Sequence, residues 1–148
     1  PNCPLIVANG AMRRADVKRA VACGADGIQL DEPFVLTEEC GAPEAVRAVY
    51  AAAERREALV LKSPLGMPVR MLRNALADRI ARGNVDPARC IGCIGLCPKK
   101  DIPFCLTEAL NATARGDAEN GILFCAENGG RTAAHGAVTV ADIFKALR

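Results

Sequence analysis

The segment LIVANGAMRRADVKRAVACGADGIQLDEPF, residues 5–34, decides the fold class. It opens with four apolar residues that end at Asn9-Gly10, as in a strand buried on both faces of a parallel sheet. An amphipathic helical pattern follows, and Gly24 suits the left-handed residue that ends many helices. A second apolar run occupies residues 27–30. The segment therefore predicts a strand, a helix and a parallel strand, the repeating unit of α/β folds.

The carboxyl ends of the two predicted strands are the expected functional positions. Open α/β sheets bind their ligands in the loops that follow the strands. Asn9-Gly10 follows the first strand, and Asp31-Glu32 follows the second, on which Gln29 lies near the same end. These two loops are the first candidates for a binding site.

Composition excludes several classes of partner. The 148 residues carry 19 basic and 17 acidic side chains, so a net charge of +2 leaves no electrostatic footprint for nucleic acid. No apolar run approaches the length of a membrane span, and the amino end has no signal-peptide pattern. We therefore expect a cytoplasmic protein with neither nucleic-acid nor membrane partners. In that reducing compartment the eight cysteines are better interpreted as ligands, reactive thiols or core residues than as disulfides.

The two predicted strands cannot form a stable sheet alone. The sequence opens on Pro-Asn-Cys-Pro without Met, and the first strand begins almost at once. A two-stranded piece is marginal without neighbours. We therefore expect a fragment of a longer protein.

The rest of the chain, residues 37–148, is expected to be mainly helical. Short apolar segments at 59–61 and 122–125 interrupt the helical patterns. The last helix has Thr139 at its start and Asp142 three residues later, a variant of the capping box. Helices are predicted from Pro43, from Pro68 to Arg82, from Leu106 to Arg115 and from Thr139 onward.

Four cysteines have ligand-like spacing. Cys90, Cys93, Cys97 and Cys105 follow the pattern C-x2-C-x3-C-x7-C, with glycines that let a tight loop point its thiolates at one centre. Four thiolates suit either a [4Fe–4S] cluster or structural zinc. The pattern partly resembles the iron–sulfur loop of the 2,4-dienoyl-CoA reductases. The alternative is that these are small apolar residues packed in an Ala-rich segment.

Three stretches together resemble one family. They are residues 5–40, KSPLGMPVRMLRN at 62–74, and CLTEALNATARGDAENGILFCAENGGR at 105–131. They are similar to the carboxyl-terminal half of the nitronate monooxygenase family, also called the 2-nitropropane dioxygenase or NAD(P)H-dependent flavin oxidoreductase family. The resemblance implies the carboxyl-terminal part of an FMN-binding TIM (β/α)8 barrel whose amino-terminal half lies outside this chain. Residues 1–36 would supply the last βαβ unit, and residues 37–148 a helical extension with a Cys-rich loop at 90–105.

The resemblance also implies a cofactor site. In such barrels a phosphate commonly sits on the loops after strands seven and eight. Asn9, Gly10, Gln29, Asp31 and Glu32 would then contact FMN. The family has Gly-Thr where this chain has Asp31-Glu32, and one like-charge contact at about 4 Å costs roughly 4 kcal/mol at an effective dielectric constant of about 20. The two carboxylates are therefore expected to weaken phosphate binding unless they point to solvent.

The activity implied is the oxidation of alkyl nitronates or nitroalkanes by O2. Family members take their catalytic base, a His, from an earlier part of the barrel, so no catalytic residue is assigned in this chain. His135, its only His, is interpreted as a solvated loop residue. One alternative is an electron-transfer or structural module with iron–sulfur or zinc and a degenerate flavin site. Another is an NAD(P)H-dependent flavin reductase acting on enoyl-type substrates. A homo-oligomer is one assembly that the sequence allows.

Overall fold

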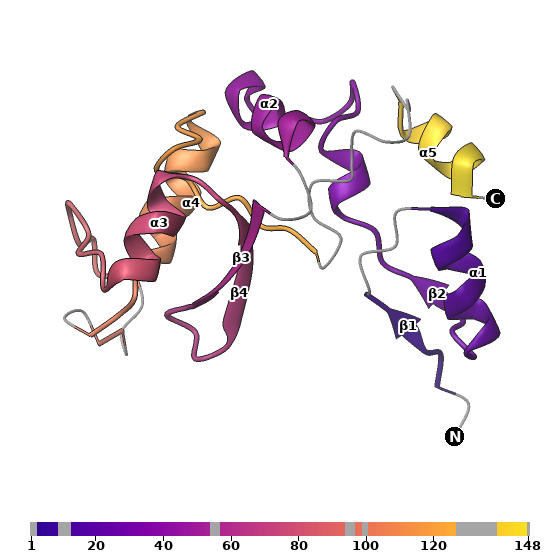
Figure 1. Cartoon of the computed structure of the whole chain (residues 1–148), viewed down its shortest axis with the longest axis horizontal. Helices are drawn as coiled ribbons and strands as arrows, with labels where there is room; N and C mark the ends of the chain where they lie inside the picture. Colours follow the sequence, from indigo (N-terminus) through magenta and orange to yellow (C-terminus); the bar gives the residue numbers. More distant parts are fainter. Residues whose placement is uncertain are drawn as a thin grey trace.

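The amino-terminal unit has the predicted order of strand, helix and strand. We analysed a computed structural model, which describes residues 3–8, 13–53, 57–93, 97–98, 101–126 and 139–147. The unit consists of β1 (Ile6–Val7), α1 (Arg14–Ala22) and β2 (Gly27–Ile28). The strands are parallel, with Ile6 opposite Gly27 and Val7 opposite Ile28. The prediction of a parallel βαβ unit is confirmed (Figure 1).

Within this unit, the sequence predicts the end of α1 correctly but not the exposure of β1. Gly24 has a φ of 97° just after α1, so it is the left-handed residue that the pattern predicts. The expectation that the first strand is buried on both faces is wrong for this chain. Leu5 and Ile6 expose 52% and 59% of their surface because, within the described residues, β1 pairs with β2 alone.

The carboxyl-terminal helix packs on this amino-terminal unit. After β2 the chain forms a short 3-10 helix, η1 (Glu32–Phe34), and α5 (Val140–Leu147) contacts both η1 and α1 (Figure 1). The rings of Phe34 and Phe144 lie 6.1 Å apart. Thr139 caps α5 as predicted, because its hydroxyl oxygen accepts from the backbone amide of Asp142 at 3.2 Å. The last helix, α5, therefore packs on elements near the amino end of the chain.

A β-hairpin replaces part of a predicted helix. The sequence predicts one amphipathic helix over residues 68–82, but Pro68–Leu72 is a strand, β4, and helix α3 (Ala75–Arg82) begins only after it. β4 pairs antiparallel with β3 (Ala58–Lys62), which places Leu59 opposite Met71. The predicted helix is wrong in this half because the backbone of β4 forms its hydrogen bonds with β3 instead.

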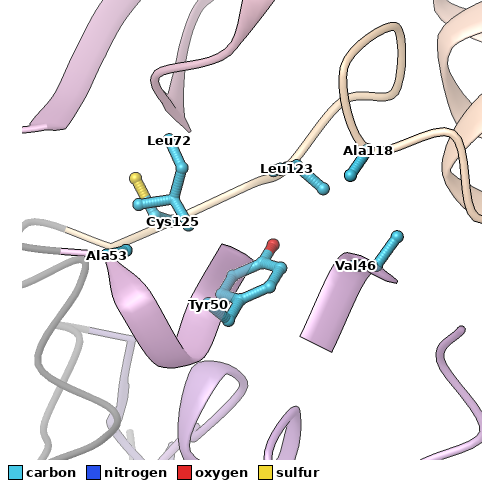
Figure 2. Packing of buried hydrophobic residues seen from close by; sticks show 7 residues of the cluster. All are labelled: Val46, Tyr50, Ala53, Leu72, Ala118, Leu123 and Cys125. Atoms are coloured by element: carbon cyan, nitrogen blue, oxygen red, sulfur yellow. The ribbon is translucent and has the colours of Figure 1, made fainter. Parts of the chain in front are cut away.

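A late segment completes the core beside the hairpin. Helix α4 (Leu106–Ala114) lies near α3 (Figure 1), and the segment 122–125 then runs along β4, where Met71 and Phe124 form an antiparallel bridge. Leu123 from this segment and Leu72 from β4 pack on helix α2 (Glu44–Ala52) (Figure 2). The resulting cluster is Val46, Tyr50, Ala53, Leu72, Ala118, Leu123 and Cys125. A second cluster joins β4, α3 and α4, namely Met71, Leu76, Ala77, Ile80, Phe104, Ala109 and Ile122.

None of the helices in the described ranges is long and apolar enough to cross a membrane.

Candidate functional site

The carboxyl ends of β1 and β2 lie side by side. Because the strands are parallel, the chain leaves both at the same edge of the sheet, and the backbone amide of Gln29 donates to the carbonyl oxygen of Val7 at 3.0 Å. The loops after the strands therefore start next to each other, as expected for a binding edge. Asn9 and Gly10, two of the predicted cofactor contacts, lie outside the described residues.

Gln29 and Asp31 form a polar pair at this edge. The side-chain amide of Gln29 donates to both carboxylate oxygens of Asp31, at 3.1 and 3.3 Å. Both residues are exposed. The pair holds the Asp31 carboxylate beside the strand end and leaves the amide oxygen of Gln29 as an acceptor.

Glu32 is buried, whereas the adjacent Asp31 is exposed. Only 6% of its surface is exposed, and neither carboxylate oxygen has a hydrogen-bond partner within the described part of the chain. The alternative that both carboxylates point to solvent is therefore wrong for Glu32, whereas Asp31 is exposed. Glu32 is buried because it opens η1, which packs against α5.

The surroundings of Glu32 favour its neutral form. Burial raises the pKa of its carboxyl, the nearby backbone N–H of Ala126 partly opposes that effect, and the charge of Asp31 reinforces it. A buried acid loses hydration, and here the backbone N–H of Ala126 replaces only part of it, which favours the protonated form relative to an exposed acid. Glu32 is thus a perturbed carboxyl four residues after the end of β2.

Tyr50 and Cys125 share this environment. The Tyr50 hydroxyl donates to the backbone oxygen of Phe124 at 2.7 Å, which ties α2 to the segment 122–125 (Figure 2). Burial, and then the charge of Glu32, raise the pKa of the Tyr50 phenol. The same two causes raise the pKa of the Cys125 thiol to about 12, while Arg70 acts in the opposite direction. Neither group is activated as a nucleophile or a base.

These observations bear on whether the residues fit an anionic cofactor. Two charged carboxylates beside a phosphate would repel it, and the raised pKa of Glu32 makes this side chain a weaker source of repulsion than an ordinary acid. Burial of Glu32 thus leaves Asp31 as the exposed carboxylate of this pair.

Three of the four motif cysteines line one cavity. Cys93, Cys97 and Cys105 surround a space of about 130 Å³, together with apolar residues such as Ile102. Cys90 is exposed and does not line this cavity. Across the part of the chain that the structure describes, no three His, Cys, Asp or Glu side chains are placed to hold one metal ion. The metal site at these cysteines stays a prediction.

The sequence analysis missed the residues around Glu32. Tyr50 and Cys125 are far from Glu32 along the chain, so no local spacing links them. One signal was available, because a lone Tyr on the apolar face of a predicted helix needs an acceptor for its hydroxyl. His135 lies outside the described residues, and within those residues no catalytic base is assigned.

Comparison with solved structures supports the fold. FabK from Thermotoga maritima matches 99% of the chain with a TM-score of 0.69 and 22% identity, and the chain covers 45% of it. A nitroalkane oxidase from Streptomyces ansochromogenes matches 99% of the chain with a TM-score of 0.66 and 23% identity, and 39% of it is covered. The predicted α/β class is confirmed. The described residues hold one βαβ unit of the expected barrel and not a closed barrel.

Sequence comparison gives the family. A protein of Mycobacterium tuberculosis named as a monooxygenase is 33% identical over 75 residues, which are 51% of this chain and 20% of the relative. A hydroxy-methyl-oxo-octahydroindene-carboxyl-CoA dehydrogenase of the same organism is 31% identical over 81 residues, 55% of this chain and 23% of the relative. The matched part is thus less than a quarter of each relative. The profile described as nitronate monooxygenase matches residues 2–148, and the chain belongs to that family.

Proposed function

We propose that the chain is the cofactor-binding, carboxyl-terminal part of an FMN-dependent oxidoreductase that oxidises alkyl nitronates or nitroalkanes with O2. The family match over residues 2–148 carries this proposal. A parallel strand pair whose carboxyl ends meet at one edge is consistent with it. A nitroalkane oxidase among the similar structures supports the substrate class.

The residues of this chain would bind and orient the cofactor. When bound, FMN supplies the redox chemistry of the reaction. The backbone at Asn9, Gly10 and Asp31 would receive the phosphate, and the amide oxygen of Gln29 would accept a hydrogen bond at the same edge. The raised pKa of Glu32 would lessen the repulsion between this carboxyl and the phosphate.

Flavin titration of the purified 148-residue chain tests the cofactor part of this proposal. We expect FMN fluorescence to be quenched on binding. The double variant Asp31→Gly/Glu32→Thr should bind FMN more tightly because it removes both carboxyl groups at the strand end. Glu38→Gln removes an exposed acid outside the strand ends and should match the wild type. If none of the three proteins binds FMN, the chain holds no flavin site.

A second candidate activity is NAD(P)H-dependent reduction of an enoyl-type substrate. The similarity to FabK and to a carboxyl-CoA dehydrogenase favours this alternative. Activity assays in the presence of FMN separate the two activities. O2 consumption with an alkyl nitronate supports the first, and oxidation of NADH or NADPH with an enoyl thioester supports the second.

A third candidate is a metal-binding module centred on Cys90, Cys93, Cys97 and Cys105. The shared cavity of three of these residues favours it. Metal analysis and the visible spectrum of the anaerobically purified chain test it, with Cys93→Ser as the variant and Cys23→Ser as an exposed control. Iron or zinc that is lost in Cys93→Ser alone supports the module. A metal-free, folded wild type contradicts it.

A further inference from the structure

Helices α3 and α4 border a cavity whose described lining lies between residues 76 and 120. Its volume of about 360 Å³ falls within the usual range of small-molecule sites, about 300–1,000 Å³. The floor is apolar and buried, since Leu76, Phe104 and Ala112 expose 4%, 1% and 4% of their surface. Ala109 and Ala112 lie one turn apart on α4, and their small side chains leave a hollow beside α3.

The two helices are antiparallel, so the cavity has two different ends. The start of α3 meets the segment after α4, because the amide of Leu76 donates to the carbonyl oxygen of Glu119 at 2.9 Å. The segment after α3 meets the start of α4, because the amide of Ala88 donates to both carboxylate oxygens of Glu108, at 3.1 and 3.2 Å. The helical rise from Glu108 to Arg115, which both line the cavity, separates these ends by about 10 Å.

One end carries an oriented arginine. Nη2 of Arg79 donates to the side-chain oxygen of Asn120 at 2.7 Å, and the side-chain nitrogen of Asn120 donates to the Asp117 carboxylate at 2.9 and 3.1 Å. The bond to Asn120 uses one of the five N–H groups of Arg79, and the others can donate to an anion such as a carboxylate. Arg115 lines the same end, so the described lining there has two cations against the carboxylate of Asp117.

The opposite end carries carboxylates. Asp86 and Glu108 line the cavity there, and both cations of the described lining are at the other end. Glu108 fixes the wall through the amide of Ala88, and a carboxylate has about four lone-pair sites, so it can accept further hydrogen bonds. The cavity thus has a positive end, an apolar floor and a negative end.

We propose that this cavity binds a linear dipolar molecule of the ω-amino-acid class, with its carboxylate at Arg79 and its ammonium group at Glu108 and Asp86. The apolar floor receives the hydrocarbon chain between the two charges, and the charges of the two ends select its orientation. The distance between the ends favours an extended chain over an α-amino acid, which carries both charged groups on one carbon. The lining contains none of the residues assigned to the flavin, so this inference does not depend on the proposed function.

Titration of the isotope-labelled 148-residue chain with ε-aminocaproate, followed by NMR, tests this inference. We expect saturable shifts of amides at both ends of the cavity, including those of Ala88 and Asn120. Hexanoate and hexylamine each lack one of the two charged groups. Each should bind about tenfold more weakly than ε-aminocaproate, because each loses one charge-assisted hydrogen bond.

Two variants assign the ends of the ligand. Arg79→Met should weaken ε-aminocaproate and hexanoate about tenfold and leave hexylamine unchanged. Glu108→Gln should weaken ε-aminocaproate and hexylamine without weakening hexanoate, and its amide oxygen keeps an acceptor for Ala88. Arg14→Met removes an exposed cation on α1 and should match the wild type with all three compounds.

Three outcomes would overturn the inference. The first is the absence of saturable shifts with ε-aminocaproate, or shifts confined to amides outside residues 76–120. The second is equal affinity for ε-aminocaproate and hexanoate, because the negative end would then contribute nothing. The third is an Arg79→Met variant that binds ε-aminocaproate as well as Arg14→Met does.

Discussion

Asn74 joins the start of α3 to the turn at residues 118–121. Its side-chain oxygen accepts from the amide of Ala77 at 2.9 Å, and its side-chain nitrogen donates to the carbonyl oxygens of Ala118 and Gly121 at 2.7 and 2.8 Å. Glu119 accepts from the first two amides of α3. All four amides at this helix start therefore have acceptors, since the fourth donates to the Asn74 carbonyl.

Asn74→Ala should destabilise the fold by about 3 kcal/mol. Loss of the N-cap costs about 1 kcal/mol. Each of the two carbonyls left without its donor adds about 1 kcal/mol at the low end of the usual range. For a domain of this size the melting temperature should fall by about 6–12 °C. Urea unfolding followed by far-UV circular dichroism suits a chain without Trp and with one Tyr.

Two matched variants separate the contributions. Asn74→Ser keeps a capping oxygen but cannot reach both carbonyls, so it should lose about 2 kcal/mol. Asn84→Ala, at an exposed position, should stay within about 0.5 kcal/mol of the wild type. An Asn74→Ala variant as stable as Asn84→Ala would refute the reasoning. A stable Asn74→Ser variant would refute only the contribution of the two carbonyls.

Three further predictions concern close packing, thiol reactivity and pH. A Cβ at Gly121 would lie 2.5 Å from the hydroxyl of a threonine in α4, whereas one at Gly41 would meet nothing within 4 Å. In urea unfolding Gly121→Ala should therefore lose about 2 kcal/mol and Gly41→Ala almost nothing, and equal losses would contradict this packing. Because burial raises the pKa of Cys125 from 9.0 to about 12, its thiolate fraction at neutral pH falls about a thousandfold. Peptide mapping after maleimide labelling should find the exposed Cys23 modified long before Cys125, and similar rates would disprove the burial. Glu32 ionises near its ordinary value of 4.5 when unfolded and at higher pH when folded, so its contribution to stability is full below 4.5 and is lost as the pH rises through the folded pKa. Glu32→Gln should remove this loss from a series of urea midpoints measured against pH, and an unchanged series would contradict it.

The sequence predicts the elements that local patterns determine. Two apolar runs and Gly24 predict the βαβ unit, and Thr139 with Asp142 predicts the start of α5. The hairpin is missed because the apolar residues at 69, 72, 76 and 80 keep helical spacing across a strand and a helix. The turn residues between β3 and β4 were a usable signal, since apolar runs flank a Pro- and Gly-containing loop.

The site is less predictable than the fold. The strand ends follow from the pattern, and Gln29, Asp31 and Glu32 lie there as expected. The opposite exposures of Asp31 and Glu32 do not follow, because they depend on packing against α5 and on proximity to Tyr50 and Cys125. These contacts join residues that lie far apart in the sequence, so no local pattern can predict them. The grouping of three motif cysteines around one cavity is closer to what their spacing suggests.

The pairing of β4 with the segment 122–125 has a consequence during synthesis. Met71 and Leu72 are 0% and 1% exposed, and the amide of Leu72 donates to the carbonyl of Leu123 at 2.8 Å. The ribosome makes Leu123 about fifty residues after Leu72, which takes about 3–10 s at about 5–20 residues per second. Until then the nascent hairpin presents an apolar face and an open strand edge. A chaperone that binds extended apolar segments would find its site here, and release would follow once residue 125 has left the exit tunnel.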